Sequence, residues 1–579
     1  MPKTVSIQFV VGPLHAGSVH LAFFVSYASA TISFRLRAKL SSLSALAVCF
    51  FFLMAGFAFL PHLGIENDEA IFANAFYKPG GSEEYVYTLG HSRLPLMLMS
   101  YLGTLKSWIY RPVFRLLGTR VYTLRIPVLL AGAASIWLFY QLMRRVAGER
   151  AALIGCGLLS VDAIYLLATC FDWGPVALQH LLVVGGALAL ARFWQDRNEL
   201  ALAVGFFLFG LALWDKAVAI WLLSGLGIAA VMTMPRQIFD RLTARRLAVA
   251  VLALAFGAMP LIVYNVRSGL GTLQGTTTFD ASDIPGKARA LRGTLNGSVL
   301  FGWLTAENWQ TQSPHAPRGW LQRASATIAQ WTGNPRHSFL FYAFCAALLL
   351  TPLAKGAGLR AIVFALVAMA VAWCQMAFAA GAGGGAHHVI LLWPLPQMVI
   401  GISFAAASRR LGRAGIPVLA SILVVLMGSG LAVMNEYYAQ TVRNGGAVAW
   451  NDAIFPLSDY MKGATSRSVF CLDWGFLDTL RMLSNGKLPV RVGSEQISKP
   501  ELSLEDHRQL NGMISEPDNV FLAHTKDFEF GRGLSARLIQ YAGNAGLHRE
   551  ILAVISDSFG RPVFEVYRFA GPPQVSTLR

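Results

Sequence analysis

The chain has 579 residues, of which 55% are hydrophobic and only 14% charged, and its mean hydropathy is +0.50. Apolar runs near the roughly 20 residues that span a bilayer recur along it, which excludes an ordinary soluble protein and predicts a polytopic α-helical membrane protein. The net charge of +17 does not indicate nucleic-acid binding, because Lys and Arg stand in short clusters between the apolar runs, as they do in cytoplasmic loops.

Residues 1–39 are interpreted as a cytoplasmic leader without a convincing cleavage site. Its basic end, with Arg35, Arg37 and Lys39, places the N-terminus on the cytoplasmic side, and the first span follows at 41–62. The six cysteines form neither a CxxC pair nor a paired framework, so disulfide and zinc-finger interpretations have no support.

The first outer loop, residues 66–120, is too polar to span the membrane and too apolar to be a free loop. It begins within "GIENDEAIFANAF", in which Glu66, Asp68 and Glu69 lie within four positions. Further on, "RLPLMLMSYLGTLKSWIYRPVF" is typical of helices that lie at the membrane interface, where aromatic side chains such as Trp108 suit the headgroup level. We therefore expect an acidic, interfacial segment directly outside the first span.

Ten more spans are predicted from the later apolar runs, which gives about eleven in all. Every second connection is rich in Arg and nearly free of acidic residues, which fixes the parity of the spans with the N-terminus inside. The predicted ranges are 122–143, 150–170, 175–193, 200–214, 217–234, 247–265, 338–354, 361–380, 388–407 and 415–434.

Two less apolar pieces fall on the outer side by the same count. One is a long loop, residues 267–336, within a transmembrane domain of residues 40–434. The other, residues 435–579, is predicted to be a small α/β domain on the periplasmic side. In it "SVFCLDWGF", "NVFLAHT" and "PVFEVYRF" are typical of strands, whereas "LDTLRML" and "GLSARLIQYAG" have helical periodicity.

Parity also gathers ionisable residues at the ends of the spans onto one face of the membrane. Because such groups are costly at membrane depth, their clustering on one side predicts a shared polar cavity. The residues on this outer face are Asp68 and Glu69 after the first span, Asp172 after the third, Asp215 and Lys216 after the fifth, and His387 and His388 between the ninth and tenth.

Each of these residues also has a simpler structural interpretation. Glu66 is favoured as a solvated loop residue, and Asp172 in the tight turn "DWGP" can cap the following helix. Asp215 and Lys216 can form a local ion pair, and the two histidines can be solvated loop residues. Two carboxylates and a cation in one outer cavity fit either proton-coupled transport or chemistry on a phosphate-bearing lipid.

The order and common sidedness of these motifs resemble the GT-C glycosyltransferases, in particular the branch of the protein O-mannosyltransferases and the lipid A aminoarabinose transferase. "NDEAIFANAF" is similar to the first outer loop of that family, which carries an Asp-Glu pair just outside the first span. "SRLPLMLMSYLG", "FDWGPVALQ" and "GLALWDKAVAIW" are similar to segments that follow it. The resemblance covers roughly residues 40–235 and is architectural beyond them.

The resemblance implies an inverting transfer of a sugar from a polyprenyl-phosphate carrier to a hydroxyl group on the periplasmic side of a bacterial inner membrane. Asp68 aligns with the family's catalytic Asp and would be the general base that deprotonates the acceptor. Arg93 and Lys216 would hold the lipid phosphate. Asp172, with Glu69, would orient the acceptor, or Asp172 and Asp68 would bind a divalent metal ion, which some relatives use.

The sequence departs from the aminoarabinose transferase at two positions. Asn74 stands where that enzyme has a second acid, and Ser92 precedes Arg93 where it has a Glu. The metal ion, the sugar and the acceptor, whether a glycolipid, a polysaccharide or a protein, therefore stay open. The alternatives are a proton- or ion-coupled transporter or flippase of lipid-linked sugars, although no repeated halves are visible, and a non-catalytic assembly protein.

Overall fold

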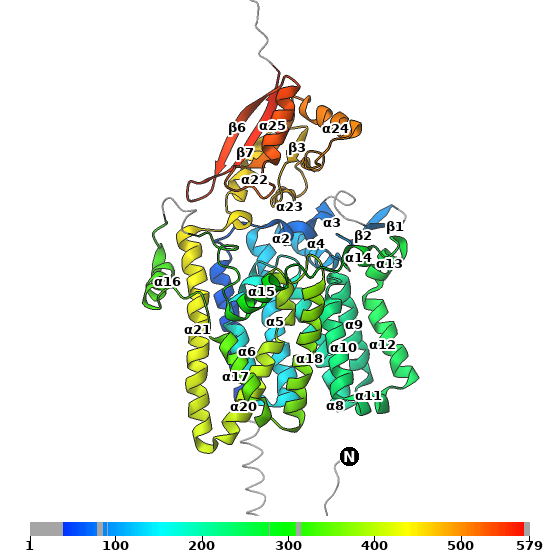
Figure 1. Ribbon diagram of the computed structural model, residues 1–579, viewed down its shortest axis with the longest axis vertical. Helices are drawn as coiled ribbons and strands as arrows, with labels where there is room; N and C mark the ends of the chain where they lie inside the picture. The colour runs from blue at the N-terminus through cyan, green and yellow to red at the C-terminus, as the bar shows by residue number, and fades with distance from the viewer. Residues whose placement is uncertain (1–38, 78–84, 90, 277, 308–313, 572–579) are drawn as a thin grey trace, which may run out of the picture.

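The structure, a computed structural model, describes residues 39–77, 85–89, 91–276, 278–307 and 314–571. The predicted leader, apart from Lys39, lies outside the described residues. A body of long helices carries a small α/β domain at one end, and a layer of short elements lies between the two (Figure 1). The predicted class, a polytopic α-helical membrane protein with a small C-terminal α/β domain, is confirmed.

Five helices of the described chain are long and apolar enough to cross a membrane, judged by length and composition. They are the first helix (Lys39–Phe59), α5 (Val121–Ala147), α8 (Val176–Asp196), α18 (Gly356–Phe378) and Gly412–Asn444, most of which is α21 (Gly415–Asn444). Two apolar helices are shorter, namely α9 (Glu199–Asp215) and α17 (Leu340–Leu350).

Four pairs of apolar helices are bent by more than 40° at a short break, and counting each pair as one span raises the number to as many as nine. The predicted count of about eleven therefore stays a prediction. The pairs are α6 (Glu149–Ser160) with α7 (Ala163–Cys170), α10 (Ala219–Thr233) with α11 (Pro235–Arg241), α12 (Ala244–Gly257) with α13 (Met259–Arg267), and Ala386–Leu392 with α20 (Leu395–Arg410).

The span predicted at 150–170 is broken in the structure, with a bend of 61° between α6 and α7. Asp162 lies at the break and caps α7 by accepting hydrogen bonds from the backbone N–H groups of Ile164 and Tyr165. Its other oxygen accepts from Trp393 Nε1 at 2.6 Å and from Gln397 Nε2 at 3.0 Å. The apolar pattern missed this break because the partners that satisfy the buried carboxylate lie more than 230 residues away.

Helices α9 and α12 pack so closely that their backbones touch. A Cβ atom on Gly210 would lie 2.2 Å from the carbonyl oxygen of Leu254, and one on Gly257 would lie 2.3 Å from that of Phe207. Only glycine permits this approach, which is usual where helices cross in a membrane. The contact fixes α9, whose last residue is Asp215.

The layer of short elements contains α2 (Asn67–Ala70), a 3₁₀ turn (Ile71–Ala73), α3 (Asn74–Tyr77), the hairpin of β1 (Tyr85–Leu89) and β2 (Ser92–Met97), and α4 (Leu105–Leu117). The helix expected in this segment is present as α4, whereas residues 93–97 belong to β2 instead of a helix, and the interfacial location stays a prediction. Pro95 lacks the N–H group that a helix interior needs and is tolerated in a two-stranded hairpin.

The C-terminal domain is built on a five-stranded sheet in the order β4-β3-β5-β7-β6. The three strands and two helices expected from the sequence are present as β3, β5, β7, α23 and α25, whereas β4 and β6 were missed. Strands β3, β4 and β5 are parallel, and β7 pairs antiparallel with β5 and β6. The elements are β3 (Ser468–Cys471), α23 (Leu477–Leu483), β4 (Val490–Val492), α24 (Leu504–Ile514), β5 (Asn519–His524), α25 (Leu534–Asn544), β6 (His548–Ser556) and β7 (Pro562–Ala570).

The predicted start of this domain at residue 435 is wrong, because α21 continues as a helix to Asn444. Its last turns contain the buried side chains of Val433, Met434 and Tyr437, so they pack as part of the helical body. The polar residues that suggested a boundary, such as Glu436, are themselves buried there.

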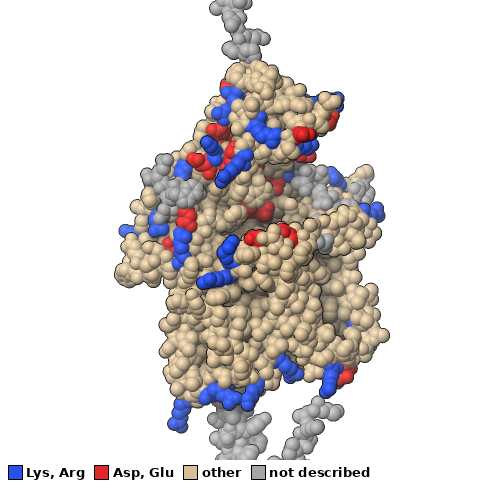
Figure 2. Space-filling model, viewed as in Figure 1, with Lys and Arg blue, Asp and Glu red and all other residues tan. Residues whose placement is uncertain are grey.

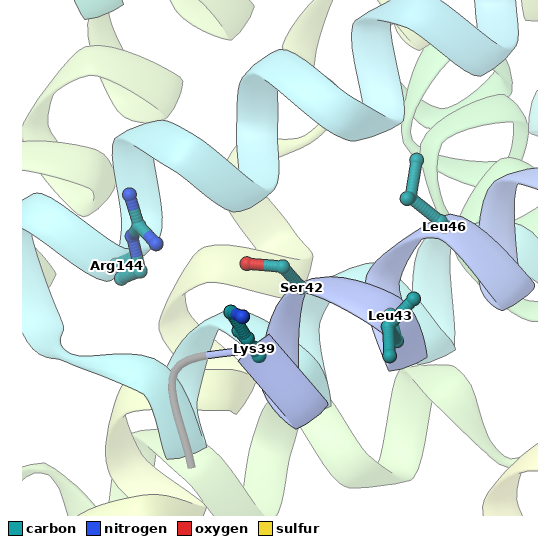
Figure 3. Close-up of a pocket in the computed structure, with 5 residues that line it drawn as sticks. All are labelled: Lys39, Ser42, Leu43, Leu46 and Arg144. Carbon is teal, nitrogen blue, oxygen red and sulfur yellow. The ribbon is translucent and has the colours of Figure 1, made fainter. Parts of the chain in front are cut away.

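Positive charge gathers at the end of the helical body that lies away from the C-terminal domain (Figure 2). The first helix leads from Lys39 to the acidic loop, and α2 lies directly beneath the C-terminal domain (Figure 1). A groove near the start of this helix is lined by Lys39, Ser42, Leu43, Leu46 and Arg144 (Figure 3). A whole span separates the groove from the acidic loop, so it is not part of the site described below.

Candidate active site

The short helix α2 is held in place by Glu66, which is its N-cap residue. Glu66 Oε2 accepts hydrogen bonds from the backbone N–H groups of Asp68 at 2.7 Å and Glu69 at 3.1 Å. Its side chain is buried, so the interpretation as a solvated loop residue is wrong. Burial and the neighbouring Asp68 raise the pKa of Glu66 well above its ordinary value. This cap fixes the first turn of α2, which contains Asp68 and Glu69.

Glu69 forms a buried, bidentate salt bridge with Arg125 of α5. Arg125 Nε donates to Glu69 Oε1 at 2.7 Å and its second terminal nitrogen donates to Oε2 at 2.9 Å. The same guanidinium donates to the carbonyl oxygens of Leu60, Leu63 and Gly64, so it ties α2 to the end of the first helix. Both oxygens of Glu69 are committed, which favours a structural role over the predicted contact with the acceptor.

Asp172 caps the following helix, as its simpler interpretation expected, and it also forms an ion pair that the sequence did not predict. One carboxylate oxygen accepts from the backbone N–H of Ala177 at 2.8 Å in the first turn of α8. The other oxygen lies 2.7 Å from Nζ of Lys106 on α4, and both side chains are buried. The ammonium also stands 4.6 Å from the centre of the Phe72 ring. This pair joins the interfacial layer to the helical body.

Asp215 and Lys216 lie side by side at the end of α9, yet no salt bridge joins them within the described residues, so the structure does not support the local ion pair. Asp215 is fully buried, and neither of its carboxylate oxygens has a hydrogen-bond partner among the described residues. It lies within electrostatic range of Asp172, Lys106 and Lys216. The chain therefore holds a compact group of opposite charges in which one carboxylate is left without a donor.

The ammonium group of Lys216 lies within electrostatic range of Asp68 on α2. It makes no side-chain hydrogen bond or salt bridge with the described residues, although its side chain is only 3% exposed. Its Nζ lies beside Gly174 of the "DWGP" turn, where a Cβ atom would stand 3.0 Å from it. Gly174 has φ of +71°, so this turn needs glycine both for its backbone and for the space of the ammonium.

Asp68 is the one acid of this group that is neither buried nor committed to a cation. Burial of its surroundings raises the pKa of Asp68 above its ordinary value, the ammonium of Lys216 opposes this rise, and the carboxylate of Asp478 adds to it. Acidic side chains are visible at a hollow beneath the C-terminal domain in the space-filling view (Figure 2). A partly accessible carboxylate with a raised pKa suits a general base.

His387 and His388 stand next to this group instead of being solvated. The His387 ring lies 6.1 Å from that of Trp173 and 4.1 Å from that of His388. Nδ1 of His388 is buried and has no partner among the described residues. Both imidazoles are partly buried within electrostatic range of Lys216, so the outer ends of the spans do meet as parity predicted.

Arg93, which was predicted to hold the lipid phosphate, lies on β2 opposite Thr88 of β1 and is exposed. The hairpin reaches the site at its other end, where Trp214 Nε1 donates to the carbonyl oxygen of Leu96 at 2.8 Å. The phosphate role of Arg93 stays a prediction.

The sequence missed an acid that comes from the C-terminal domain. Asp478 of α23 accepts from Asn67 Nδ2 at 3.0 Å and from Asn74 Nδ2 at 2.6 Å. Asn74 is the position where the aminoarabinose transferase carries a second acid, and here the amide pairs with an acid from another domain. No local signal in the sequence joins these residues, which are 411 and 404 positions apart.

The predicted divalent ion at Asp68 and Asp172 does not fit these contacts. Both oxygens of Asp172 already accept, one from an ammonium and one from a backbone N–H. In the described part of the chain no group of three or more His, Cys, Asp or Glu side chains is placed to hold a metal. Metal dependence stays a prediction of the sequence.

The comparisons agree with this architecture. The model of the dolichyl-phosphate-mannose-protein mannosyltransferase family matches residues 103–264, a segment that contains Lys106, Asp172 and Lys216. The fold is similar to ArnT from Cupriavidus metallidurans in the apo state, with a TM-score of 0.54, 14% identity, and 92% of this chain and 98% of that chain covered. No curated protein matches the sequence.

ArnT from the same organism bound to undecaprenyl phosphate gives a TM-score of 0.53 at 13% identity, over 91% of this chain and 97% of that chain. The protein thus has the GT-C glycosyltransferase fold over nearly its whole length. The resemblance drawn from the acidic motifs is confirmed.

Proposed function

We propose that the protein is an inverting glycosyltransferase that moves a sugar from a polyprenyl-phosphate carrier to a hydroxyl group of an acceptor. The observation that carries this proposal is the partly exposed carboxylate of Asp68 within electrostatic range of Lys216, whose ammonium has no salt bridge with the described residues, in a fold similar to that of a protein solved with undecaprenyl phosphate. A base next to a cation is what attack by a hydroxyl on a phosphate-linked sugar requires.

In the proposed reaction the acceptor hydroxyl attacks the anomeric carbon while Asp68 takes its proton. The new carbon–oxygen bond forms as the bond from that carbon to the phosphate oxygen breaks, and the electron pair of the broken bond stays on the polyprenyl phosphate. A single displacement inverts the anomeric carbon. The leaving phosphate needs no proton, only stabilisation of its charge, which Lys216 supplies from a buried position where its field is strong.

The other ion pairs of the site hold its parts together. Arg125 and Glu69 fix α2 against the first helix and α5, and Lys106 and Asp172 fix the "DWGP" turn against α4. Because proximity of reacting groups accounts for much of catalysis, these pairs support the reaction without touching the sugar. Arg93 is the proposed second phosphate ligand.

The proposed location is a bacterial inner membrane with the site on the periplasmic face. Lys and Arg gather at the end of the helical body opposite to the site, which by the positive-inside rule is the cytoplasmic end (Figure 2). The acceptors that fit a site at the membrane surface are glycolipids, polysaccharides and proteins that carry free hydroxyl groups.

The proposal is tested with the purified protein in sealed lipid vesicles. The vesicles contain undecaprenyl phosphate carrying a radiolabelled sugar, and an envelope lipid extract supplies acceptors. We expect free undecaprenyl phosphate and a labelled covalent product, both identified by mass spectrometry. Label that crosses the vesicle membrane without any covalent product would support the transporter alternative and contradict the transferase.

A further inference from the structure

The buried hydrogen bonds between the C-terminal domain and the acidic loop come from helix α23, and Tyr77 at the end of the loop also donates to Asn485 just beyond this helix. Asn67 and Asp478 are joined twice, because Asn67 Nδ2 donates to Asp478 Oδ2 and the backbone N–H of Asp478 donates to Asn67 Oδ1, each at 3.0 Å. Thr479 Oγ1 adds a bond to the carbonyl oxygen of Ile65 at 3.2 Å. Asn67 directly precedes Asp68, so α23 is bonded to the chain on one side of the proposed base.

A second set of contacts fixes the other side of this loop. Asn74 Nδ2 donates to Asp478 Oδ1 at 2.6 Å, and Met482 packs in one apolar cluster with Ala70 and Phe72. Both ends of the loop, Asn67 and Asn74, are therefore hydrogen-bonded to the same carboxylate, that of Asp478. This contact is specific and buried, unlike the loose association of an independent soluble domain.

Asp478 has the surroundings of an ionised carboxylate. Asn67 and Asn74 donate to it through amide N–H groups, and Arg481 Nη1 donates to Oδ1 at 3.2 Å. Its own backbone N–H is engaged by Asn67 Oδ1. Burial raises the pKa of Asp478, and these three donors oppose that rise because they stabilise the charged form.

We propose that Asp478 is a positioning residue for the transfer reaction, which aligns the proposed base Asp68 through its hydrogen bonds with Asn67 and Asn74. This inference rests on the proposed function. It assigns the C-terminal domain a part in the active site, because α23 bonds to Asn67 and Asn74 on both sides of Asp68, in addition to the salt bridge that Arg125 makes with Glu69.

The electrostatics around Asp68 agree with this geometry. The titratable groups that face Asp68 are Lys216, Asp478, Glu66 and Tyr101. Asp478 raises the pKa of Asp68, and Lys216 lowers it. Loss of the charge on Asp478 therefore lowers the pKa of Asp68, so the base becomes ionised at lower pH and is weaker as a proton acceptor.

The test compares the wild-type chain with Asp478→Asn and Asp478→Ala in the vesicle assay. With Asp478→Asn we expect the acid limb of the kcat/KM profile to move to lower pH and kcat to fall about 10- to 100-fold, since small misalignments have effects of this size. With Asp478→Ala we expect, in addition, faster hydrogen exchange of the amides in residues 67–77. The apparent KM for the lipid donor should change little, because Asp478 does not contact the donor.

The matched control is Asp506→Asn in the same domain. Asp506 is buried in the capping box of α24, where it bonds to Ser503 and Lys499, and it makes no bond to α2. This variant should keep the wild-type pH profile and the wild-type exchange of the acidic loop. The proposal is overturned if Asp478→Asn loses kcat with its acid limb in place, or if the exchange of residues 67–77 in Asp478→Ala matches the wild type. If the wild-type protein shows no sugar transfer, the proposed function is contradicted. The hydrogen-exchange data would still show whether Asp478 stabilises the loop of residues 67–77.

Discussion

Asp68→Asn is expected to remove nearly all sugar transfer, with kcat lowered about 10²- to 10⁴-fold, the usual contribution of a general base. An amide has nearly the shape of the carboxylate but cannot accept the proton of the acceptor hydroxyl. Because Asp68 is partly exposed and carries no structural salt bridge, the chain should fold and insert normally. The measurement is release of free undecaprenyl phosphate at equal amounts of folded protein, checked by size-exclusion chromatography.

Glu66→Gln is the control for this variant in the same loop. Its amide oxygen can still accept from the backbone N–H groups of α2, so most of the activity should remain. In the wild type, activity should fall as the pH drops through the pKa of Asp68, which burial places above the usual range of an aspartate. Full turnover by Asp68→Asn would refute the assignment of the base.

Arg125→Met is expected to have the largest effect on stability, a loss of roughly 3–5 kcal/mol, as is typical when one partner of a buried ion pair is removed. Arg125 is fully buried, and its guanidinium satisfies both oxygens of Glu69 and three backbone carbonyl groups. Its loss leaves a carboxylate without a cation inside the protein. The free energy of unfolding is measured by SDS titration in mixed micelles.

Arg145→Met provides a matched comparison on the same helix, α5. Arg145 pairs with Asp196 in an exposed salt bridge, so its loss should cost less than about 1 kcal/mol. Adding Glu69→Gln to Arg125→Met should restore part of the lost stability, because the buried charge is then gone. If the effects of these two substitutions simply add, the salt bridge does not stabilise the fold in the way described.

The sequence by itself determined the membrane class and the resemblance to the GT-C fold, and it predicted that the candidate residues lie together on one side of the membrane. These features depend on composition, on apolar runs and on the distribution of Arg, which are local properties of the chain. Parity predicted that Asp68, Asp172 and Lys216 lie near one another, and in the structure Lys216 is within electrostatic range of both acids. Three strands of the C-terminal domain, β3, β5 and β7, were also visible in the sequence, because short apolar runs mark them within a few positions, whereas β4 and β6 were missed.

Only the tertiary structure decided which acid is available for chemistry. The sequence favoured Glu66 as a solvated loop residue and kept Asp68 and Glu69 as functional candidates. Packing turned Glu66 into a buried helix cap and committed Glu69 to Arg125, which lies 56 positions away. The contact of Asn67 with Asp478 spans 411 positions and joins two domains. Local propensity extends over a few residues, whereas the partner that neutralises a buried charge is chosen by the packing of the whole chain.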